Sequence, residues 1–223
     1  KGIVLDLANK GWDIAIHFNS SKNEADILAK DIKSIGRKAI ILQADLSRKI
    51  EGKDLFKIIS DELGNPPSLL INNASLFEED DIMSINEKTF WNHNAINLWA
   101  PIVLSQQFAK ISKKGNIINI IDQRVANPKV GFLSYTLAKS SLLTFSKILA
   151  QELAPEIRVN AICPGPVLQS AHQTEKEFKL EVEGLPLKIA PSIQDISRAI
   201  SFIIETSSLT GECITLDGGQ HLS

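Results

Sequence analysis

The sequence predicts an α/β fold, a doubly wound parallel sheet with helices on both faces. Short apolar strands alternate with helical patterns along the chain, and most of these strands are apolar on both faces, as in sheets that helices cover on each side. With 223 residues, 43% of them hydrophobic, the chain suits a single domain with a sizeable core. We therefore expect one domain over residues 1–223.

The N-terminal half is predicted to supply three strands. Residues 1–8 place apolar side chains on one helical stripe, and Gly11 stands where that helix should end. Residues 12–18 are mostly apolar and partly aromatic, which favours a strand, and the polar segment 24–35 favours a helix. The alternation then continues with strand 39–43, helix 55–63 and strand 68–72.

A long helix is predicted next, over residues 90–111. Pro101 is expected to kink it, because proline cannot donate the helical hydrogen bond. Residues 116–121 read Asn-Ile-Ile-Asn-Ile-Ile, which is typical of a buried strand. The remaining predicted elements follow the same patterns and are helix 135–153, strand 157–163, helix 193–204 and strand 212–216.

The composition narrows the possible partners. The 24 Lys and Arg nearly balance the 26 Asp and Glu, so neither nucleic acid nor a membrane surface is favoured. No apolar run approaches the roughly 18 residues that span a bilayer, so we expect a soluble, cytoplasmic protein that acts on a small molecule. The two cysteines, Cys163 and Cys213, lie in apolar strand-like runs, and we expect buried, reduced thiols without a disulfide, and no metal site.

Polar residues gather directly after three of the predicted strands, where an open α/β sheet binds ligands. Asn72-Asn73-Ala74-Ser75 follows one strand, Asp122 the next and Pro164-Gly165 a third. Tyr135 and Lys139 stand one helical turn apart, and a nearby cation favours the phenolate of a tyrosine, whose ordinary pKa is about 10. Taken singly, a turn aspartate and a solvated Tyr–Lys pair remain the alternative interpretations.

Asn97 is unexpected inside a predicted helix, because asparagine is a poor residue for a helix interior. Either it is solvated, or it is a functional polar group at the kink. Five ordered motifs, of which Asn97 is one, resemble the short-chain dehydrogenase/reductase family over the length of the chain. They are Asn72-Asn73-Ala74, Asn97, Tyr135-x-x-x-Lys139, Pro164-Gly165 and Asp217-Gly218-Gly219.

The resemblance implies a Rossmann-like sheet and a set of catalytic roles. Tyr135 would donate a proton to the reduced group, and Lys139 would lower the pKa of that tyrosine and hold the nicotinamide ribose. Asn97 would keep a water molecule in the proton relay. Asp122 departs from the family's usual pattern, since most members have serine thirteen residues before the tyrosine.

The resemblance also implies a nicotinamide cofactor. Asp45 would receive the adenine amino group, and Val167 would meet the carboxamide through its backbone. An acidic residue that binds NAD is missing after strand 12–18, where Asn19-Ser20-Ser21 resembles the loop of NADPH-dependent members, so we expect NADPH. Lys22 either supplies charge for the 2′-phosphate or is a solvated loop lysine. The other residues expected around the cofactor are Leu46, Asn72, Ala74, Tyr135, Lys139, Pro164 and Gly165.

At Asp122, Ser75 and Phe77 the sequence resembles the pteridine reductase branch of the family. Ser75 would hydrogen-bond and Phe77 would stack a pterin ring, which has a flat π-face and an array of donors and acceptors, although an aromatic residue is as often ordinary core. The implied function is NADPH-dependent reduction of a dihydropterin or dihydrofolate. A carbonyl reductase of 3-oxoacyl chains or other ketones, and a non-catalytic NADP-binding protein, are the alternatives. His172 is a further candidate substrate contact, unless it is solvated.

A second departure from the family is the absence of its first strand and Gly-rich turn from these residues. Family members begin with a strand and a Gly-rich turn, which precede the helix already under way at Lys1. The absent strand would lie in the middle of the sheet, so we expect these residues to come from a longer protein. The resemblance also implies a homotetramer, with the last strand and residues 220–223 near an interface.

Overall fold

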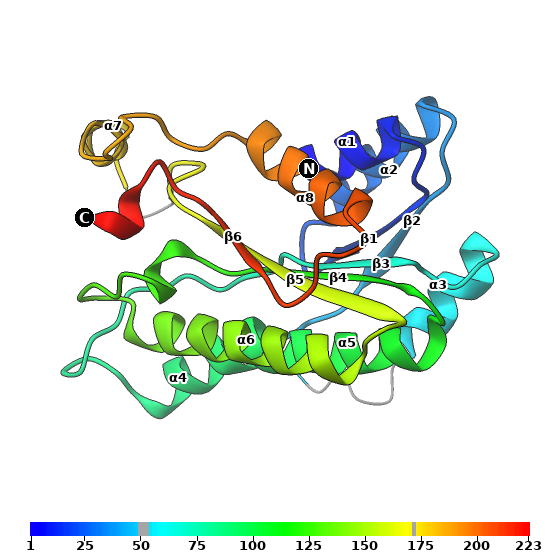
Figure 1. Ribbon diagram of the computed structural model, residues 1–223, viewed down its shortest axis with the longest axis horizontal. Coiled ribbons are helices and arrows are strands. Elements are labelled where there is room, and N and C mark those ends of the chain that lie inside the picture. Colours follow the sequence, from blue (N-terminus) through cyan, green and yellow to red (C-terminus); the bar gives the residue numbers. More distant parts are fainter. Residues whose placement is uncertain (49–53, 171–172) are drawn as a thin grey trace.

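The protein is described by a computed structural model that covers residues 1–48, 54–170 and 173–223. Parallel strands lie between two layers of helices (Figure 1). The strands are β1 Ile14–Phe18, β2 Ala39–Gln43, β3 Leu69–Asn72, β4 Gly115–Ile120, β5 Ile157–Pro164 and β6 Cys213–Leu216. The α-helices are α1 Gly2–Asn9, α2 Lys22–Ser34, α3 Leu55–Leu63, α4 Glu87–Asn94, α5 Ala100–Ile111, α6 Leu133–Glu152, α7 Glu175–Glu183 and α8 Ile193–Glu205. Shorter helical segments are η1 Ala95–Trp99, η2 Gln123–Val125 and η3 Gln220–Leu222.

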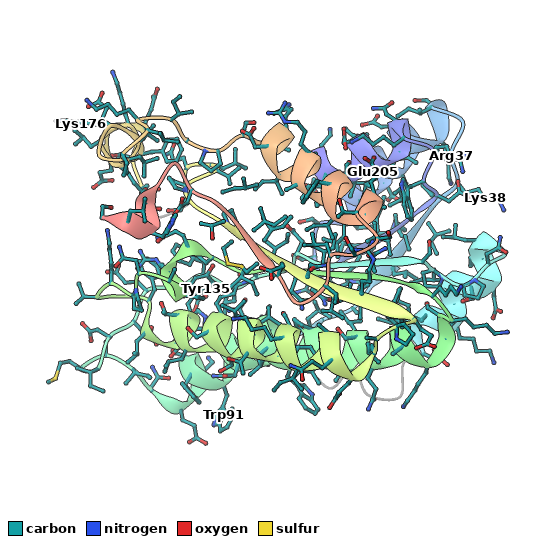
Figure 2. All side chains as sticks on the ribbon, in the orientation of Figure 1. Arg37, Lys38, Trp91, Tyr135, Lys176 and Glu205 are labelled. Atoms are coloured by element: carbon teal, nitrogen blue, oxygen red, sulfur yellow. A yellow bond between two sulfur atoms is a disulfide. The ribbon has the colours of Figure 1, made fainter. Side chains whose placement is uncertain are left out.

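Each helical layer has its own apolar core against the sheet. Helices α1, α2 and α8 pack on one face around Ile32, Ile118 and Ile200, all fully buried. Helices α3, α5 and α6 pack on the other face, where Phe108 is fully buried and meets Phe56 edge to face. Figure 2 shows the side chains filling both spaces. Among the described residues, no helix combines the length and the apolar character that crossing a membrane requires.

The sheet is interrupted between β1 and β3. Strands β1 and β2 form one parallel pair, and β3, β4, β5 and β6 form a second parallel sheet in that order. A cavity of about 920 Å³ separates the two parts and is lined by Ile14 to Phe18 on one side and Leu69 to Asn72 on the other. The interruption lies where the family resemblance places its absent strand.

The predicted helix over residues 90–111 is three segments. Helix α4 ends at Asn94, a π-helix runs from Ala95 to Trp99, and α5 begins at Ala100. The expected irregularity at Pro101 is therefore present, but it lies in the turn before the proline. Pro101 has no N–H to donate to the carbonyl of Asn97, four residues earlier, which explains why regular α-helix is lost at this point.

The expectation of reduced cysteines is wrong in this structure, because Cys163 and Cys213 form a disulfide. The two residues lie on neighbouring strands, where Ala161 pairs with Cys213 and Cys163 pairs with Thr215. This offset leaves their Cα atoms 6.4 Å apart, within the usual range for a disulfide. Each cysteine was correctly placed in a strand, but the sequence did not reveal the register between strands that brings the two sulfurs together.

Candidate active site

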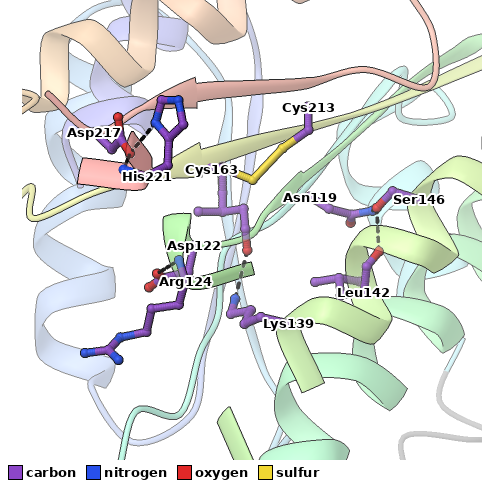
Figure 3. Close-up of a disulfide and its surroundings, with 11 residues drawn as sticks. Asn119, Asp122, Arg124, Lys139, Leu142, Ser146, Cys163, Cys213, Asp217 and His221 are labelled. Carbon is purple, nitrogen blue, oxygen red and sulfur yellow. Dashed lines mark hydrogen bonds and ion pairs between the residues drawn. A yellow bond between two sulfur atoms is a disulfide. The ribbon is translucent and has the colours of Figure 1, made fainter. Parts of the chain in front are cut away.

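Asp122, Tyr135 and Lys139 meet at the carboxyl end of β4, as the sequence predicts. Asp122 follows the strand, and the other two project from the first turns of α6. The Tyr135 hydroxyl donates a hydrogen bond to Oδ2 of Asp122 over 2.8 Å. The Lys139 ammonium donates to the carbonyl of Ile120 over 2.8 Å, and Figure 3 draws Lys139 together with Asp122. The ammonium lies 5.7 Å from the centre of the Tyr135 ring. Tyr135 and Lys139 are both buried.

Asp122 is held by the turn that follows it. Its backbone is extended, and its Oδ1 accepts a hydrogen bond from the Arg124 N–H over 2.8 Å, which caps the short helix η2. One carboxylate oxygen is therefore fixed by the backbone and the other receives the Tyr135 hydroxyl. An aspartate cap positions the acid without help from a side chain of the turn.

Burial dominates the electrostatics of the three groups. It raises the pKa of Asp122, against the opposing effects of the Arg124 N–H, the Tyr135 hydroxyl and the charges of Arg124 and Lys139. It also raises the pKa of Tyr135, and the Asp122 carboxylate raises it further. The pKa of Tyr135 is thus raised overall, and the expectation that Lys139 lowers it stays a prediction. Burial lowers the pKa of Lys139 itself to about 8.

Asn97 lies at the centre of the π-helix and is fully buried. Its Oδ1 accepts hydrogen bonds from the Ser75 hydroxyl and the Leu76 N–H, each over 3.0 Å. Its amide donates to the Leu76 carbonyl over 2.9 Å and lies 3.4 Å from Nδ1 of His93. The side chain thus ties the segment after β3 to the helix. The alternative of a solvated position is wrong, and the role of Asn97 in a water relay stays a prediction.

Phe77 stands beside the catalytic tyrosine candidate. Its ring centre is 4.7 Å from that of Tyr135, with the two rings nearly perpendicular. It also stacks on Phe132, with ring centres 4.1 Å apart and planes 4° from parallel. Phe77 is half-buried, so it is not ordinary core. Ser75, exposed and bonded to Asn97, completes the same edge of the site.

The cavity between β1 and β3 continues along the carboxyl ends of the strands, where an open α/β sheet binds dinucleotides. It reaches Ile120, whose carbonyl accepts the Lys139 hydrogen bond, and the buried Oδ1 of Asn72 has no hydrogen-bond partner among the described residues. The part of the cavity between β1 and β3 lies where the absent strand is expected, so only the polar strand ends and this unpaired acceptor support a dinucleotide site. Six of the expected cofactor residues line the cavity, namely Ser21, Leu46, Asn72, Ala74, Pro164 and Val167.

A family model described as enoyl-(acyl carrier protein) reductase matches residues 1–221. The chain belongs to the short-chain dehydrogenase/reductase family. It is accordingly an oxidoreductase of that family, and its sheet, interrupted as it is, has the Rossmann-like arrangement expected from the sequence.

Three similar proteins show the range of the family around this chain. The crystal structure of FolM alternative dihydrofolate reductase 1 from Brucella canis, complexed with NADP, is 42% identical, with a TM-score of 0.95, and the match covers 100% of this chain and 89% of that one. The uncharacterized oxidoreductase YjdA of Bacillus subtilis is 32% identical over 97% of this chain and 89% of its own. The 3-oxoacyl-[acyl-carrier-protein] reductase FabG of Staphylococcus epidermidis is 26% identical over 100% and 94%.

Some residues expected to bind the short-chain dehydrogenase/reductase cofactor are engaged elsewhere. The carboxylate of Asp45 accepts two hydrogen bonds from Ser47 and pairs with Arg48, so the pKa of Asp45 is lowered. Lys22 pairs with Asp26 over 2.9 Å. Asn19 and Ser20 are exposed at the end of β1. His172 lies outside the described residues.

Gly165 does not line the cavity, yet its place beside Asp217 requires glycine. A Cβ atom there would come within 2.8 Å of the Asp217 backbone, so only glycine lets the segments after β5 and β6 approach each other. The motif residues Pro164-Gly165 and Asp217-Gly218-Gly219 are therefore neighbours in space. Their contact shapes the end of the cavity that Pro164 and Val167 line.

Sequence reasoning missed three residues of the site. Asp80 is buried and binds the first turn of α6, where its carboxylate accepts from the N–H and the hydroxyl of Ser134, which precedes Tyr135. Phe132 covers Phe77, and Arg124 lies over Phe132. Asp80 follows two glutamates in a polar loop, and no local pattern separates it from a solvated aspartate.

Proposed function

We propose that this short-chain dehydrogenase/reductase is an NADPH-dependent reductase of a pteridine, of the dihydropterin or dihydrofolate type. The hydrogen bond between Tyr135 and Asp122 carries the proposal, because the carboxyl group replaces the family's usual serine hydroxyl in contact with the tyrosine. Phe77, beside Tyr135, offers a flat apolar surface for a ring. The 42% identity to FolM alternative dihydrofolate reductase 1 supports the same function.

Reduction of a pteridine C=N bond adds a hydride to carbon and a proton to nitrogen. The phenol of Tyr135 already donates to Asp122, and its pKa is raised from an ordinary value near 10. The pKa of Asp122 is raised by burial, but its carboxyl is still the stronger acid of the pair and is therefore the group that we propose gives up the proton. The Tyr135 hydroxyl and the Arg124 N–H then stabilise the carboxylate that forms.

Substrate binding would use the segment after β3. Phe77 would stack the pterin, and Ser75 would hydrogen-bond it through its hydroxyl oxygen, which remains an acceptor while the hydrogen is donated to Asn97. Asn97 would keep this segment against the π-helix by its two bonds to Leu76. Asn97 would therefore position Ser75 and Phe77 for the substrate, in addition to any role in a water relay.

NADPH, bound in the cavity at the strand ends, would supply the hydride. Asn19, Ser20 and Ser21 after β1 carry no carboxylate to repel a 2′-phosphate, and Lys139 would hold the nicotinamide ribose. Asp45, through its free lone pairs, would accept from the adenine amino group. The test is the ratio of kcat/KM with NADPH to that with NADH. We expect NADPH to be preferred, and a preference for NADH would overturn the assignment.

A carbonyl reductase is the second candidate, because the chain is 26% identical to a 3-oxoacyl-[acyl-carrier-protein] reductase over its whole length. A substrate panel separates the two functions. NADPH consumption is measured with dihydropterin, dihydrofolate, a 3-oxoacyl thioester and simple ketones at equal concentrations. We expect the highest kcat/KM with a pteridine. Turnover confined to the ketones would favour the second candidate, and stoichiometric NADPH binding without any turnover would indicate a non-catalytic binding protein.

We also propose that the protein assembles as a homotetramer. Large apolar side chains are exposed on α4, on the π-helix and on α6, namely Trp91, Trp99, Leu137 and Ile148. Strand β6 forms the edge of its sheet, and Leu222 beyond it is exposed. Light scattering on the purified protein should give four times the mass of the chain, and a monomer would contradict the proposal.

A further inference from the structure

The segment that follows β3 is joined to the start of α6 by three contacts. Phe77 stacks on Phe132, with ring centres 4.1 Å apart. The backbone N–H of Leu133 donates to the carbonyl of Asp80 over 3.1 Å. The Asp80 carboxylate binds Ser134, whose N–H donates to Oδ1 over 3.0 Å and whose hydroxyl donates to Oδ2. These contacts place the proposed substrate platform against the first turn of the helix that carries the tyrosine of the site.

Asp80 supplies a cap that the sequence of α6 does not provide. The N-cap residue of this helix is Phe132, whose side chain has no hydrogen-bond acceptor and whose φ of 55° lies in the left-handed region. An N-cap side chain usually accepts the N–H of the second or third helical residue. Here the Asp80 carboxylate accepts the N–H of Ser134, the second residue of α6, from a position 54 residues earlier in the chain. The start of α6 therefore depends on a tertiary contact.

The contact between Asp80 and Ser134 is buried. Asp80 is 3% exposed and Ser134 is fully buried. Both carboxylate oxygens accept a hydrogen bond, as an ionised carboxylate does, and bonds to an ionised acceptor are roughly twice as strong as neutral ones. A negative charge is also favourable at the N-terminus of a helix. Removal of the carboxylate would leave two buried donors of Ser134 without their acceptor.

The two residues that would face the substrate lie directly beside this contact. Tyr135 follows Ser134 in the sequence, and Phe77 stands three residues before Asp80. The ring centres of Phe77 and Tyr135 are 4.7 Å apart, with the two rings nearly perpendicular. Because Phe77 and Tyr135 belong to the two segments that Asp80 joins, the contact sets the spacing between their rings.

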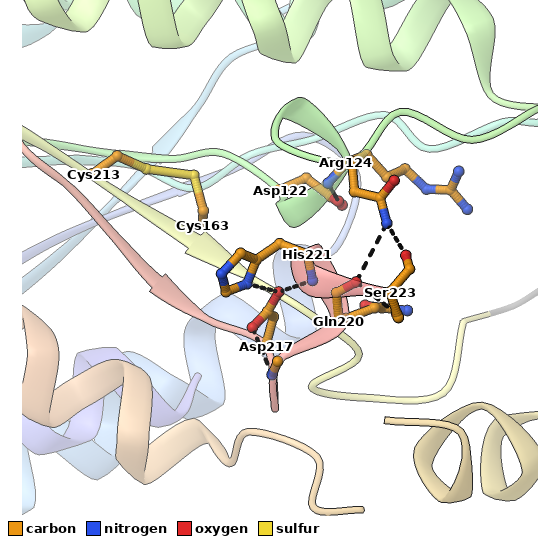
Figure 4. Close-up of polar contacts among 10 residues, drawn as sticks. Asp122, Arg124, Cys163, Cys213, Asp217, Gln220, His221 and Ser223 are labelled. Carbon is orange, nitrogen blue, oxygen red and sulfur yellow. Dashed lines mark hydrogen bonds and ion pairs between the residues drawn. A yellow bond between two sulfur atoms is a disulfide. The ribbon is translucent and has the colours of Figure 1, made fainter. Parts of the chain in front are cut away.

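Asp122, the hydrogen-bond partner of Tyr135, is held by other contacts. Its carboxylate caps η2, and the C-terminal segment packs against η2 from the other side of the site. Asn127, just after η2, donates to the Gln220 carbonyl over 3.4 Å (Figure 4). A change at Asp80 should therefore act on the spacing of the rings and leave the support of Asp122 in place.

We propose that Asp80 is a positioning residue, which holds the ring of Phe77 at a fixed distance from Tyr135. It does so through its two hydrogen bonds to Ser134. The inference rests on the proposed binding of a pteridine at Phe77. Without the carboxylate, the first turn of α6 and the segment that carries Phe77 would separate, and a ring stacked on Phe77 would lose its alignment with the groups that protonate it.

The NMR signal of the Tyr135 ring tests this without any turnover. Tyr135 is the single tyrosine of the sequence, so tyrosine labelled with ¹³C in its ring gives one set of signals, identified by its loss in Tyr135→Phe. The ring current of Phe77 shifts these signals, and Phe77→Leu measures that shift. In Asp80→Ala we expect a displacement in the same direction as in Phe77→Leu and of comparable size.

Further variants separate the hydrogen bonds from other effects. Asp80→Asn removes the charge, but its amide oxygen still accepts from the Ser134 N–H, so the signals should stay near those of the unmodified protein. Asp81→Ala is the matched control and should displace nothing, since Asp81 is exposed and binds Met83 and Ser84 in its own turn. Should Asp80→Ala fail to fold, Ser134→Ala loses only the hydroxyl bond and should give a smaller displacement in the same direction.

Unmoved signals in Asp80→Ala would overturn the proposal, as would an equal displacement in Asp80→Asn or Asp81→Ala. The second readout is kinetic. In Asp80→Ala, kcat/KM for dihydropterin should fall by about 10–10²-fold, the cost of displacing reacting groups by up to about 1 Å, while Kd for NADPH should stay the same. An equal loss of NADPH affinity would contradict the proposal, because it would show a general loss of structure. A protein that reduces no pteridine would refute the proposed function, while the NMR signals would still decide the role of Asp80.

Discussion

The Tyr135 hydroxyl donates to Asp122 over 2.8 Å, so the phenol and the carboxyl group act as a single unit. A serine in place of Asp122 could donate a hydrogen bond to a substrate carbonyl but could not release a proton near neutral pH. A carboxyl group can do so, and burial brings its pKa closer to neutrality. In the proposed function, this contact is the feature that suits the site to the reduction of a C=N bond.

Lys139 should make stability depend on pH in an unusual direction. Burial lowers its pKa from 10.5 to about 8, so between these values the unfolded chain holds a proton that the native protein has lost. The free energy of unfolding should therefore rise with pH across this window, by up to about 3 kcal/mol relative to Lys139→Met, which has no such proton. Urea unfolding of both proteins at pH 7 to 10 measures the difference.

Lys147→Met is the matched control for this experiment, because Lys147 lies on the same helix and is exposed. The difference between this variant and the unmodified protein should not change with pH. A Lys139→Met difference that is equally flat would show that the ammonium is not held in a buried site.

Asn97→Ala should loosen the segment after β3, which carries Ser75 and Phe77. The change removes two hydrogen bonds to the backbone of Leu76 and one from Ser75, and a buried group left without its partner costs about 1–3 kcal/mol. KM for the pteridine should rise more than KM for NADPH, because the loosened segment carries Ser75 and Phe77. Asn94→Ala is the control, since Asn94 bonds only to the Phe90 carbonyl in its own helix among the described residues. Equal effects of the two variants would contradict this role for Asn97.

The disulfide between Cys163 and Cys213 should contribute to stability. It closes a separation of 50 residues, and the loop-closure entropy of a loop of that size corresponds to about 4 kcal/mol. Reductant should lower the free energy of unfolding of the unmodified protein by this amount and leave Cys213→Ser unaffected. Thiol titration in denaturant without reductant should find no free thiol, and two free thiols would show that the cysteines are reduced.

The sequence predicted the elements whose pattern is local. Strand β2 and helix α3 have the predicted bounds, because a short apolar run and a helical spacing of apolar residues are both local patterns. The conjunction of Asp122, Tyr135 and Lys139 was also predictable, since strand ends and the following helix start lie at one edge of a parallel sheet.

The features that sequence reasoning missed depend on contacts between distant residues. The π-helix holds Asn97, whose partners Ser75 and Leu76 lie more than twenty residues earlier. The disulfide depends on the register of two strands. The stack of Phe77 on Phe132 depends on the left-handed backbone of Phe132, which the sequence does not predict because phenylalanine rarely adopts it. The direction of the Tyr135 pKa shift depends on burial, which a helical spacing does not reveal.

The Asp122→Ser variant tests the central claim most directly, because it restores the family's usual residue beside Tyr135. The measurement is kcat/KM for NADPH-dependent reduction of dihydropterin and of a 3-oxoacyl thioester, with Asp122→Asn as the variant of the same shape that cannot release the proton. We expect both variants to lose about 10²–10⁴-fold on the pteridine, the contribution of a positioned acid, with no comparable loss on the thioester. Unchanged pteridine reduction in Asp122→Ser would contradict the account.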